Sequence, residues 1–247
     1  MKNVMDNWPY PLWIAHRGAG KLAPENTLAA FKLGRSFGYR AFECDVKLSS
    51  DEQCFLLHDD TLNRTSNGSG IAGDKPWSEL ARLDAGGWHS EAFRGERLAR
   101  LDEVAAFCIA EGCTVNLEIK PTSGVELHTG RVVAREAARL WAGHTPPLMS
   151  SFKVEALLGA IEGAPELPRA LLLDALKPGW LDQAKHLGCV AVVTHHPLMD
   201  LATISAIHGA GMKALVYTVN ESQRADELLT LGIDGLITDA INHFKPA

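Results

Sequence analysis

The sequence predicts a single (β/α)8 barrel, and three observations lead to this fold class. Apolar segments suited to β-strands occur at 12–16, 40–46, 53–58, 114–119, 147–151, 169–173, 189–194, 213–219 and 235–238. Segments with helical periodicity fall between most of them, at 27–37, 102–111, 129–142, 153–162, 179–187, 200–209 and 221–230. This alternation is typical of parallel strands joined by crossover helices. The chain length of 247 residues also suits one barrel, since such barrels have about 250 residues.

Nine strands are one more than the barrel needs, and the second and third strands explain the difference. Only the residues 47–52 separate them, which is too short for a crossover helix, so we expect an antiparallel hairpin. A turn centred on Ser50 and Asp51 places Glu43 opposite His58. With the hairpin set aside, eight parallel strands remain, and the active site of such a barrel lies at their carboxyl ends.

A long irregular segment at about 59–101, rich in Gly, Ser, Asn and Trp, follows the hairpin. Segments of this length inside a compact domain are usually functional loops or small subdomains. We expect Trp77, Trp88 and Phe93 to form a small core of this insertion. The sequence shows no internal repeat and no domain linker, so we expect residues 1–247 to form one domain.

The composition argues against several classes of protein. The net charge of −6 argues against nonspecific nucleic-acid binding, which needs a basic face. No segment approaches the roughly 18 consecutive apolar residues of a membrane helix, and residues 1–13 lack the apolar centre of a secretory signal. The five cysteines are scattered without a C-x-x-C motif, as in reduced cytosolic proteins. We expect a cytoplasmic protein with no nucleic-acid partner and no stable membrane association; its oligomeric state is not indicated.

Three carboxylates are candidates for a metal site. Glu43 and Asp45 share one face of a predicted strand, and Glu118 lies on the polar face of another. Three carboxylates together repel each other unless a cation neutralises them. Oxygen ligands suit Mg²⁺, Ca²⁺ or Mn²⁺ rather than zinc. Salt bridges to nearby lysines and arginines are the alternative, which would be favoured for any one carboxylate alone.

Two histidines are candidates for proton transfer, because imidazole titrates near neutral pH. His16 and His58 each end an apolar strand and have a charged neighbour, Arg17 or Asp59. Asp59 is a candidate to orient His58, although neighbouring side chains on a strand point to opposite faces. Arg17 and Lys120 supply positive charge for phosphate oxygens, and Arg17 can bind two of them at once. Charge balance within the carboxylate cluster is their alternative role.

A competing pattern lies at 18–23, where G-A-G-K-L-A fits the G-x-G-x-x-A form of a dinucleotide fingerprint. Glu43 lies about 20 residues further on, where an acid that binds ribose is expected. The fingerprint requires a helix that begins at the glycines, whereas Asn26 or Thr27 is the predicted cap. A nicotinamide-dependent oxidoreductase is therefore the weaker interpretation.

Taken in order, these motifs resemble the glycerophosphodiester phosphodiesterase family. They are H-R-G at 16–18, P-E-N-T at 24–27, E-x-D at 43–45, H-D at 58–59, R-T at 64–65, E-I-K at 118–120, Y-T-V-N at 217–220 and D-G-L-I-T-D at 234–239. The resemblance spans nearly the whole chain and is strongest to the bacterial cytosolic form. Each motif alone is weakly specific, but their ordered combination is highly specific.

The resemblance implies a TIM-barrel hydrolase that converts glycerophosphodiesters to sn-glycerol 3-phosphate and an alcohol, with one divalent cation, Mg²⁺, Ca²⁺ or Mn²⁺. By this resemblance Glu43, Asp45 and Glu118 match metal ligands, His16 and His58 match the acid and base, Arg17 and Lys120 match phosphate-binding positions, and Glu25 lies near the site. Which histidine is the acid stays open. The nucleophile is either water or the 2-hydroxyl of the substrate.

The chain departs from the family pattern at two places. Tyr217 stands where a tryptophan is expected, and 194–196 reads T-H-H where a segment with asparagine is expected. Tyr217 can stack on substrate at the barrel mouth, although core packing explains it equally well. Besides the oxidoreductase, two alternative functions remain. One is a phospholipase-type phosphodiesterase that acts on intact lipid. The other is a protein that binds a metal or glycerophosphate without catalysis.

Overall fold

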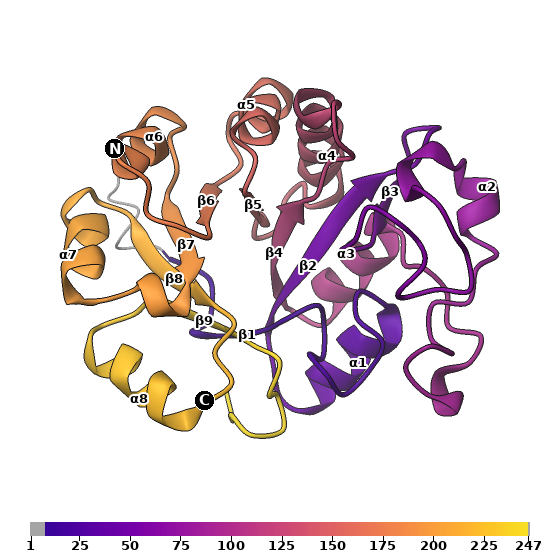
Figure 1. The fold of residues 1–247 in the computed structure, drawn as a ribbon, viewed down its shortest axis with the longest axis horizontal. Helices are drawn as coiled ribbons and strands as arrows, with labels where there is room; N and C mark the ends of the chain where they lie inside the picture. Colours follow the sequence, from indigo (N-terminus) through magenta and orange to yellow (C-terminus); the bar gives the residue numbers. More distant parts are fainter. Residues whose placement is uncertain (1–7, 247) are drawn as a thin grey trace.

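The computed structural model describes residues 8–246, which form a TIM barrel, as predicted (Figure 1). Its parallel strands are β1 (Trp13–Ala15), β2 (Ala41–Leu48), β4 (Thr114–Ile119), β5 (Leu148–Ser151), β6 (Arg169–Leu173), β7 (Ala191–His195), β8 (Lys213–Tyr217) and β9 (Gly235–Thr238). The barrel closes because β1 pairs in parallel with both β2 and β9. The first and last strands of the chain are therefore neighbours.

Helices connect successive barrel strands and cover the outside of the barrel (Figure 1). They are α1 (Leu28–Ser36), α3 (Leu101–Ala110), α4 (Glu126–Leu140), α5 (Val154–Gly163), α6 (Trp180–His186), α7 (Leu201–Gly209) and α8 (Ser222–Thr230). Each lies within three residues of the range predicted from periodicity. None of the helices in the described part of the chain is long and apolar enough to cross a membrane.

The strand β3 (Cys54–Leu56) forms the predicted antiparallel hairpin with the end of β2. The predicted register was wrong by one residue, because Val46 lies opposite Leu56 and Glu43 is not opposite His58. The reason is the length of the turn. Glu52 adopts a left-handed conformation with φ of 61°, which adds a third residue to the loop.

The interior of the barrel is apolar on one side and polar on the other. Most inward positions of β5 to β9 carry apolar side chains, among them Leu148, Leu172, Val193, Leu215 and Ile237. Inward positions of β2 and β4 carry buried polar side chains instead. Because polar groups are costly to bury without partners, this half of the barrel is expected to serve a ligand.

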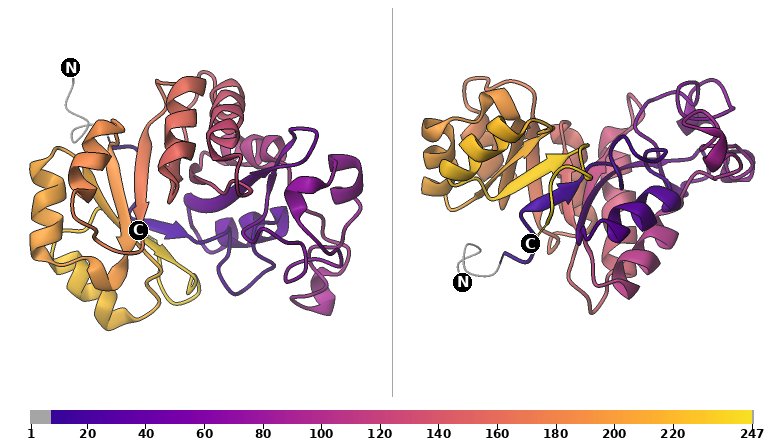
Figure 2. Two further views of the ribbon diagram at one scale, coloured as in Figure 1. Left: turned by 45° about the horizontal axis from the view of Figure 1, so that its top comes forward. Right: turned by 90° about the horizontal axis from the view of Figure 1, so that it is seen from below.

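The insertion follows β3 and packs beside the barrel, next to α1 (Figure 2). It contains the short helices η2 (Ala72–Asp74), α2 (Trp77–Leu80) and η3 (Glu91–Phe93). The expected aromatic core is confirmed only for Trp77, which packs against a small buried cluster that includes Leu80 and Leu98. Phe93 packs against the barrel cluster, and Trp88 is 40% exposed.

Candidate active site

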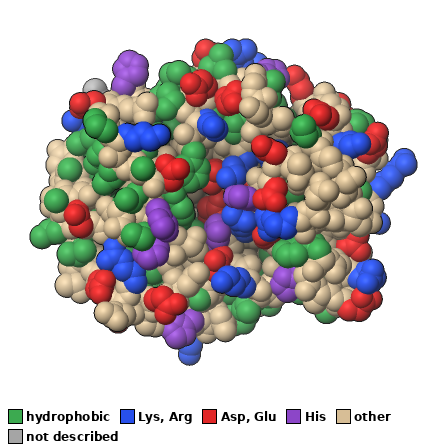
Figure 3. Space-filling model, in the orientation of Figure 1, with side chains coloured by type: hydrophobic (Ala, Val, Ile, Leu, Met, Phe, Trp, Pro, Cys, Tyr) green, Lys and Arg blue, Asp and Glu red, His purple; other side chains and the backbone are tan. Residues whose placement is uncertain are grey.

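A cavity of about 250 Å³ opens at the carboxyl ends of the barrel strands. Figure 3 shows this hollow near the middle of the face, with acidic side chains at depth and basic and histidine side chains around them. Its lining consists of His16, Arg17, Glu43, His58, Asn116, Glu118, Lys120, Phe152, Leu172, Tyr217, Thr218 and Ile237. Seven of the nine residues that the sequence selected therefore line one cavity. Asp45 and Glu25 lie directly beside it, in contact with Arg17.

The three candidate metal ligands converge in the polar half of the barrel. Each of Glu43, Asp45 and Glu118 offers a carboxylate oxygen, and these oxygens all lie within 4.8 Å of one another. The strand register explains this arrangement, because Asp45 on β2 pairs directly with Glu118 on β4. All three side chains are buried.

The electrostatics of this cluster fit a cation. Burial raises the pKa of Glu43 well above its ordinary value, and the charges of Asp45 and Glu118 raise it further. Burial and the charge of Asp45 likewise raise the pKa of Glu118 to about 7. Burial also acts to raise the pKa of Asp45, but Arg17 and Lys120 outweigh it and lower that pKa. Three converging buried oxygens that cannot all ionise freely match the ligands of a hard divalent ion.

His16 lies immediately after β1, and a carboxylate from the other end of the chain holds it. Its Nδ1 is 2.6 Å from Oδ1 of Asp239, the residue that follows β9. Its Nε2 is 3.7 Å from Oε2 of Glu43. Burial acts to raise the pKa of Asp239, but the hydrogen bond and charge of His16 outweigh it, so this pKa is lowered.

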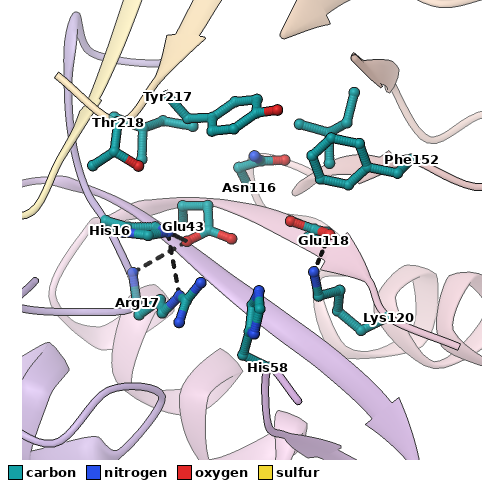
Figure 4. Close-up of a pocket in the computed structure, with 12 residues that line it drawn as sticks. His16, Arg17, Glu43, His58, Asn116, Glu118, Lys120, Phe152, Tyr217 and Thr218 are labelled. Carbon is teal, nitrogen blue, oxygen red and sulfur yellow. Dashed lines mark hydrogen bonds and ion pairs between the residues drawn. The ribbon is translucent and has the colours of Figure 1, made fainter. Parts of the chain in front are cut away.

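His58 has a similar arrangement on the opposite side of the cavity. Its Nδ1 is 2.8 Å from Oδ1 of Asp59. Because β3 ends at Leu56, the alternation of side chains along a strand no longer applies to these two residues. Burial lowers the pKa of His58, which favours the neutral ring. Each histidine thus uses Nδ1 for a carboxylate. Nε2 of His16 accepts a hydrogen bond from Nε of Arg17 at 3.2 Å, on the cavity side of the ring (Figure 4).

Arg17 contacts carboxylates with both its backbone and its side chain. Its backbone N–H donates to Oε2 of Glu43 at 3.1 Å, and its Nη1 donates to Oε1 of Glu25 at 2.7 Å. Its Nε lies 3.4 Å from Oδ2 of Asp45. Arg17 has a left-handed φ of 51°, which aims the backbone N–H at Glu43.

The glycines after Arg17 form a tight turn rather than a helix start. The N–H of Gly20 donates to the carbonyl of His16, and a Cβ at Gly20 would lie 2.1 Å from the carbonyl oxygen of Asp239. The helix α1 begins only at Leu28, after its N-cap Thr27. This geometry does not match a dinucleotide fingerprint, in which a helix begins at the glycines.

Asn26 is a site residue that the sequence analysis did not identify. Its Nδ2 donates to Oδ2 of Asp45 at 2.8 Å, and its Oδ1 accepts the backbone N–H of Asp45 at 3.1 Å. It adopts a left-handed φ of 60°, which asparagine tolerates better than most residues. The position of Asn26 in the P-E-N-T motif was a signal, but we assigned it to helix capping.

Lys120 and Tyr217 border the cavity on different sides. Nζ of Lys120 lies 2.9 Å from Oε1 of Glu118 and 3.9 Å from Oδ1 of Asp45. The hydroxyl of Tyr217 donates to the carbonyl of Leu173 at 3.1 Å, and its ring packs edge-on against Phe152. Tyr217 therefore contributes to an aromatic wall that faces the carboxylates (Figure 4).

Arg64 connects the insertion to the site. Its guanidinium donates to both carboxylate oxygens of Asp59 and to both of Glu25. Glu25 in turn binds Arg17, and Asp59 binds His58. A continuous chain of charged hydrogen bonds thus runs from one side of the cavity to the other.

Comparisons with known proteins identify the family of this chain. The model of the glycerophosphoryl diester phosphodiesterase family matches residues 16–243. A glycerophosphodiester phosphodiesterase of Caldanaerobacter subterraneus subsp. tengcongensis is 33% identical, over 92% of this chain and 93% of its own.

Two solved structures share the fold over almost the whole chain. One is an Oleispira antarctica phosphodiesterase in complex with the product sn-glycerol-3-phosphate, with a TM-score of 0.90, 35% identity and 95% coverage of both chains. The other is a glycerophosphodiester phosphodiesterase from Agrobacterium tumefaciens, with a TM-score of 0.82 and 29% identity, covering 95% of this chain and 99% of its own. Together with the cavity and its residues, these matches show that the chain belongs to the glycerophosphoryl diester phosphodiesterase family.

Proposed function

We propose that this protein hydrolyses glycerophosphodiesters to sn-glycerol 3-phosphate and an alcohol. The observation that carries the proposal is the convergence of two histidines, two positively charged side chains and three carboxylates around one cavity. The similarity to the Oleispira antarctica enzyme that binds sn-glycerol-3-phosphate supports the same product. The family model, which matches most of the chain, supports the same reaction class.

The size of the cavity supports a small substrate. At about 250 Å³ it lies below the roughly 300–1,000 Å³ typical of pockets for drug-sized ligands. A deacylated glycerophosphodiester fits this scale better than a lipid with two acyl chains. This comparison favours a water-soluble diester over the phospholipase-type alternative.

We assign Glu43, Asp45 and Glu118 as the ligands of one divalent cation, Mg²⁺, Ca²⁺ or Mn²⁺. When bound, the cation supplies positive charge for the phosphate oxygens as negative charge develops there. Arg17 and Lys120 lie beside the same carboxylates and bind the remaining phosphate oxygens. The site is thus built to hold an anion although the whole protein is acidic.

His16 and His58 carry the proton transfers in this proposal. The nucleophile is a water molecule, or it is the substrate 2-hydroxyl, in which case a cyclic glycerol phosphate forms and a water molecule then opens it to glycerol 3-phosphate. One histidine accepts the proton of the nucleophile, and the other donates a proton to the alcohol oxygen as the bond from phosphorus to that oxygen breaks. Asp239 and Asp59 accept a hydrogen bond from Nδ1–H of their histidines, which assigns these transfers to Nε2 of each ring. Nε2 of His16 exchanges its hydrogen bond from Nε of Arg17 for the substrate or the water.

The test is an assay of purified protein with glycerophosphocholine, in which released glycerol 3-phosphate is measured by a coupled enzyme. We expect release that stops with EDTA and returns with Mg²⁺, Ca²⁺ or Mn²⁺. Replacing either His16 or His58 by alanine should lower kcat by about 10²–10⁴-fold. No release from folded protein with any of these cations, across several headgroups, would refute the proposal.

A further inference from the structure

Asn116 is a buried amide in the cavity that the proposed chemistry does not use. Its side chain is 3% exposed, and it belongs to the lining of the cavity. Neither Nδ2 nor Oδ1 has a hydrogen-bond partner among residues 8–246. A buried amide without partners destabilises the fold, so its presence indicates a partner from outside the protein.

The position of Asn116 makes its polarity unexpected. It lies on β4, two residues before Glu118, so both side chains point into the barrel and Asn116 lies deeper. Its neighbour in register on β5 is Leu148, which belongs to the apolar barrel core. Asn116 thus lies where the apolar and polar halves of the barrel meet, and its amide makes no hydrogen bond with either half.

The surroundings of Asn116 define the chemistry of its partner. Glu43 is its neighbour in register on β2, and Glu118 follows it on β4, so a second anion is disfavoured there. Phe152 and Tyr217 form the aromatic wall across from it (Figure 4). An amide offers both donors and an acceptor. A neutral polyol with an aliphatic face matches all of these features.

We propose that Asn116 recognises the glycerol part of the substrate, with Oδ1 accepting from one hydroxyl and Nδ2 donating to the next. The carbon chain of the glycerol then packs against Phe152 and Tyr217, while the phosphate lies toward Arg17 and Lys120. This inference rests on the proposed function and adds to it the residue that distinguishes glycerol from other alcohols. An uncharged residue is required because a carboxylate there would only accept hydrogen bonds.

The test compares two substrates in the wild type and in Asn116→Leu, which has nearly the same shape and no polar atoms. One substrate is glycerophosphocholine, and the other is its propane-1,2-diol analogue, which keeps the 2-hydroxyl and lacks the terminal one. We expect the wild type to prefer the glycerol substrate by about 10²-fold or more in kcat/KM. In Asn116→Leu this preference should fall to about threefold or less, because the group that reads the hydroxyl is gone.

The matched control is Ser150→Ala. Oγ of Ser150 is also buried without a partner, on the neighbouring strand, but Ser150 is not part of the cavity lining. This variant should keep the wild-type preference. Asn116→Ala, checked by thermal unfolding, replaces the leucine variant if that variant does not fold.

Three outcomes overturn the inference, and they differ from one another. An unchanged preference in folded Asn116→Leu, with unchanged binding of Mn²⁺ in calorimetry, removes Asn116 from glycerol recognition. Equal losses on both substrates, with weaker binding of Mn²⁺ in calorimetry, would assign Asn116 to the carboxylate cluster instead. A wild type that hydrolyses no glycerophosphodiester at all refutes the proposed function itself, and the inference with it.

Discussion

At the scale of single residues, the two histidines share one design. Each binds a carboxylate through Nδ1, but His16 receives its carboxylate from a residue 223 positions away, whereas the partner of His58 is the next residue. Sequence analysis found both histidines because each ends an apolar strand beside a charge. It did not find Asp239, because only the pairing of β1 with β9 brings Asp239 to His16.

Asp239→Asn tests whether this carboxylate positions His16. We expect kcat to fall by about 10–10³-fold, a part of the roughly 10²–10⁴-fold contribution of positioned proton transfer, while KM changes little. Steady-state kinetics with glycerophosphocholine measure both quantities.

A matched control exists at the other end of the barrel. Oδ2 of Asp234 lies 2.7 Å from Nε2 of His208, before β9 rather than after it. Asp234→Asn should lower stability and leave kcat within about twofold, because neither Asp234 nor His208 lines the cavity. Equal losses of kcat in both variants would contradict a specific role for Asp239.

At the scale of elements, the strands and helices followed the sequence pattern closely, because the periodicity of apolar residues determines them locally. Two features could not be predicted from this pattern. The hairpin register depended on the conformation of Glu52, and a left-handed glutamate has no strong sequence signal. The contacts of the insertion depended on Arg64, whose partners Glu25 and Asp59 come from different segments.

The connection through Arg64 gives stability a dependence on pH. The hydrogen bonds of Arg64 hold the pKa of Asp59 well below its usual range. For Glu25, burial acts to raise the pKa, but Arg64 and Arg17 outweigh it and lower the value. A carboxylate whose pKa is lowered on folding stabilises the protein above its unfolded pKa of about 4, and this contribution is lost as the pH falls below that value.

Arg64→Gln should therefore lower the melting temperature more at neutral pH than in acid. We expect the difference from the wild type to be full at pH 7 and to narrow steadily as the pH is lowered from about 5 to about 2. Thermal unfolding followed by circular dichroism measures it. Arg139→Gln, which breaks the exposed salt bridge between Arg139 and Glu136 on α4, is the control. It should lower the melting temperature much less than Arg64→Gln at pH 7. A difference that is constant across this range would contradict the linkage.

At the scale of the whole molecule, the two halves of the barrel contribute different side chains to the cavity. The candidate metal ligands, both histidines, Arg17 and Lys120 lie on or next to β1 to β4, while β5 to β9 supply mainly the apolar wall of the cavity. The sequence indicated this division, since E-x-D and E-I-K are the polar interruptions of otherwise apolar strands. It could not indicate the size of the cavity, which depends on packing across the barrel.

A cation bound by this cluster should stabilise the entire fold, because its ligands come from two adjacent strands of one closed sheet. At a concentration 100 times its Kd, we expect about 2.7 kcal/mol, or a rise in Tm of roughly 5–10 °C for a chain of this size. Thermal unfolding with and without Mn²⁺ measures the rise.

Glu43→Gln should abolish this rise, and Glu162→Gln should preserve it. Glu162 is an acidic residue on α5 that pairs with Arg131, away from the cavity. A full rise in Glu43→Gln would place the cation elsewhere on the protein.

The pairing of β1 with β9 also has a consequence for how the enzyme is made. His16 is among the first described residues that a ribosome synthesises, and Asp239 is among the last. Closing so long a loop carries an entropic cost that grows only slowly with length, so distance itself is no barrier to pairing. It does set an order of events: a nascent chain can build the polar half early, yet His16 lacks its partner until β9 has been added. In the proposed mechanism, proton transfer by His16 therefore requires β9 to be in place, and a chain truncated before β9 would carry His16 without the carboxylate that orients it.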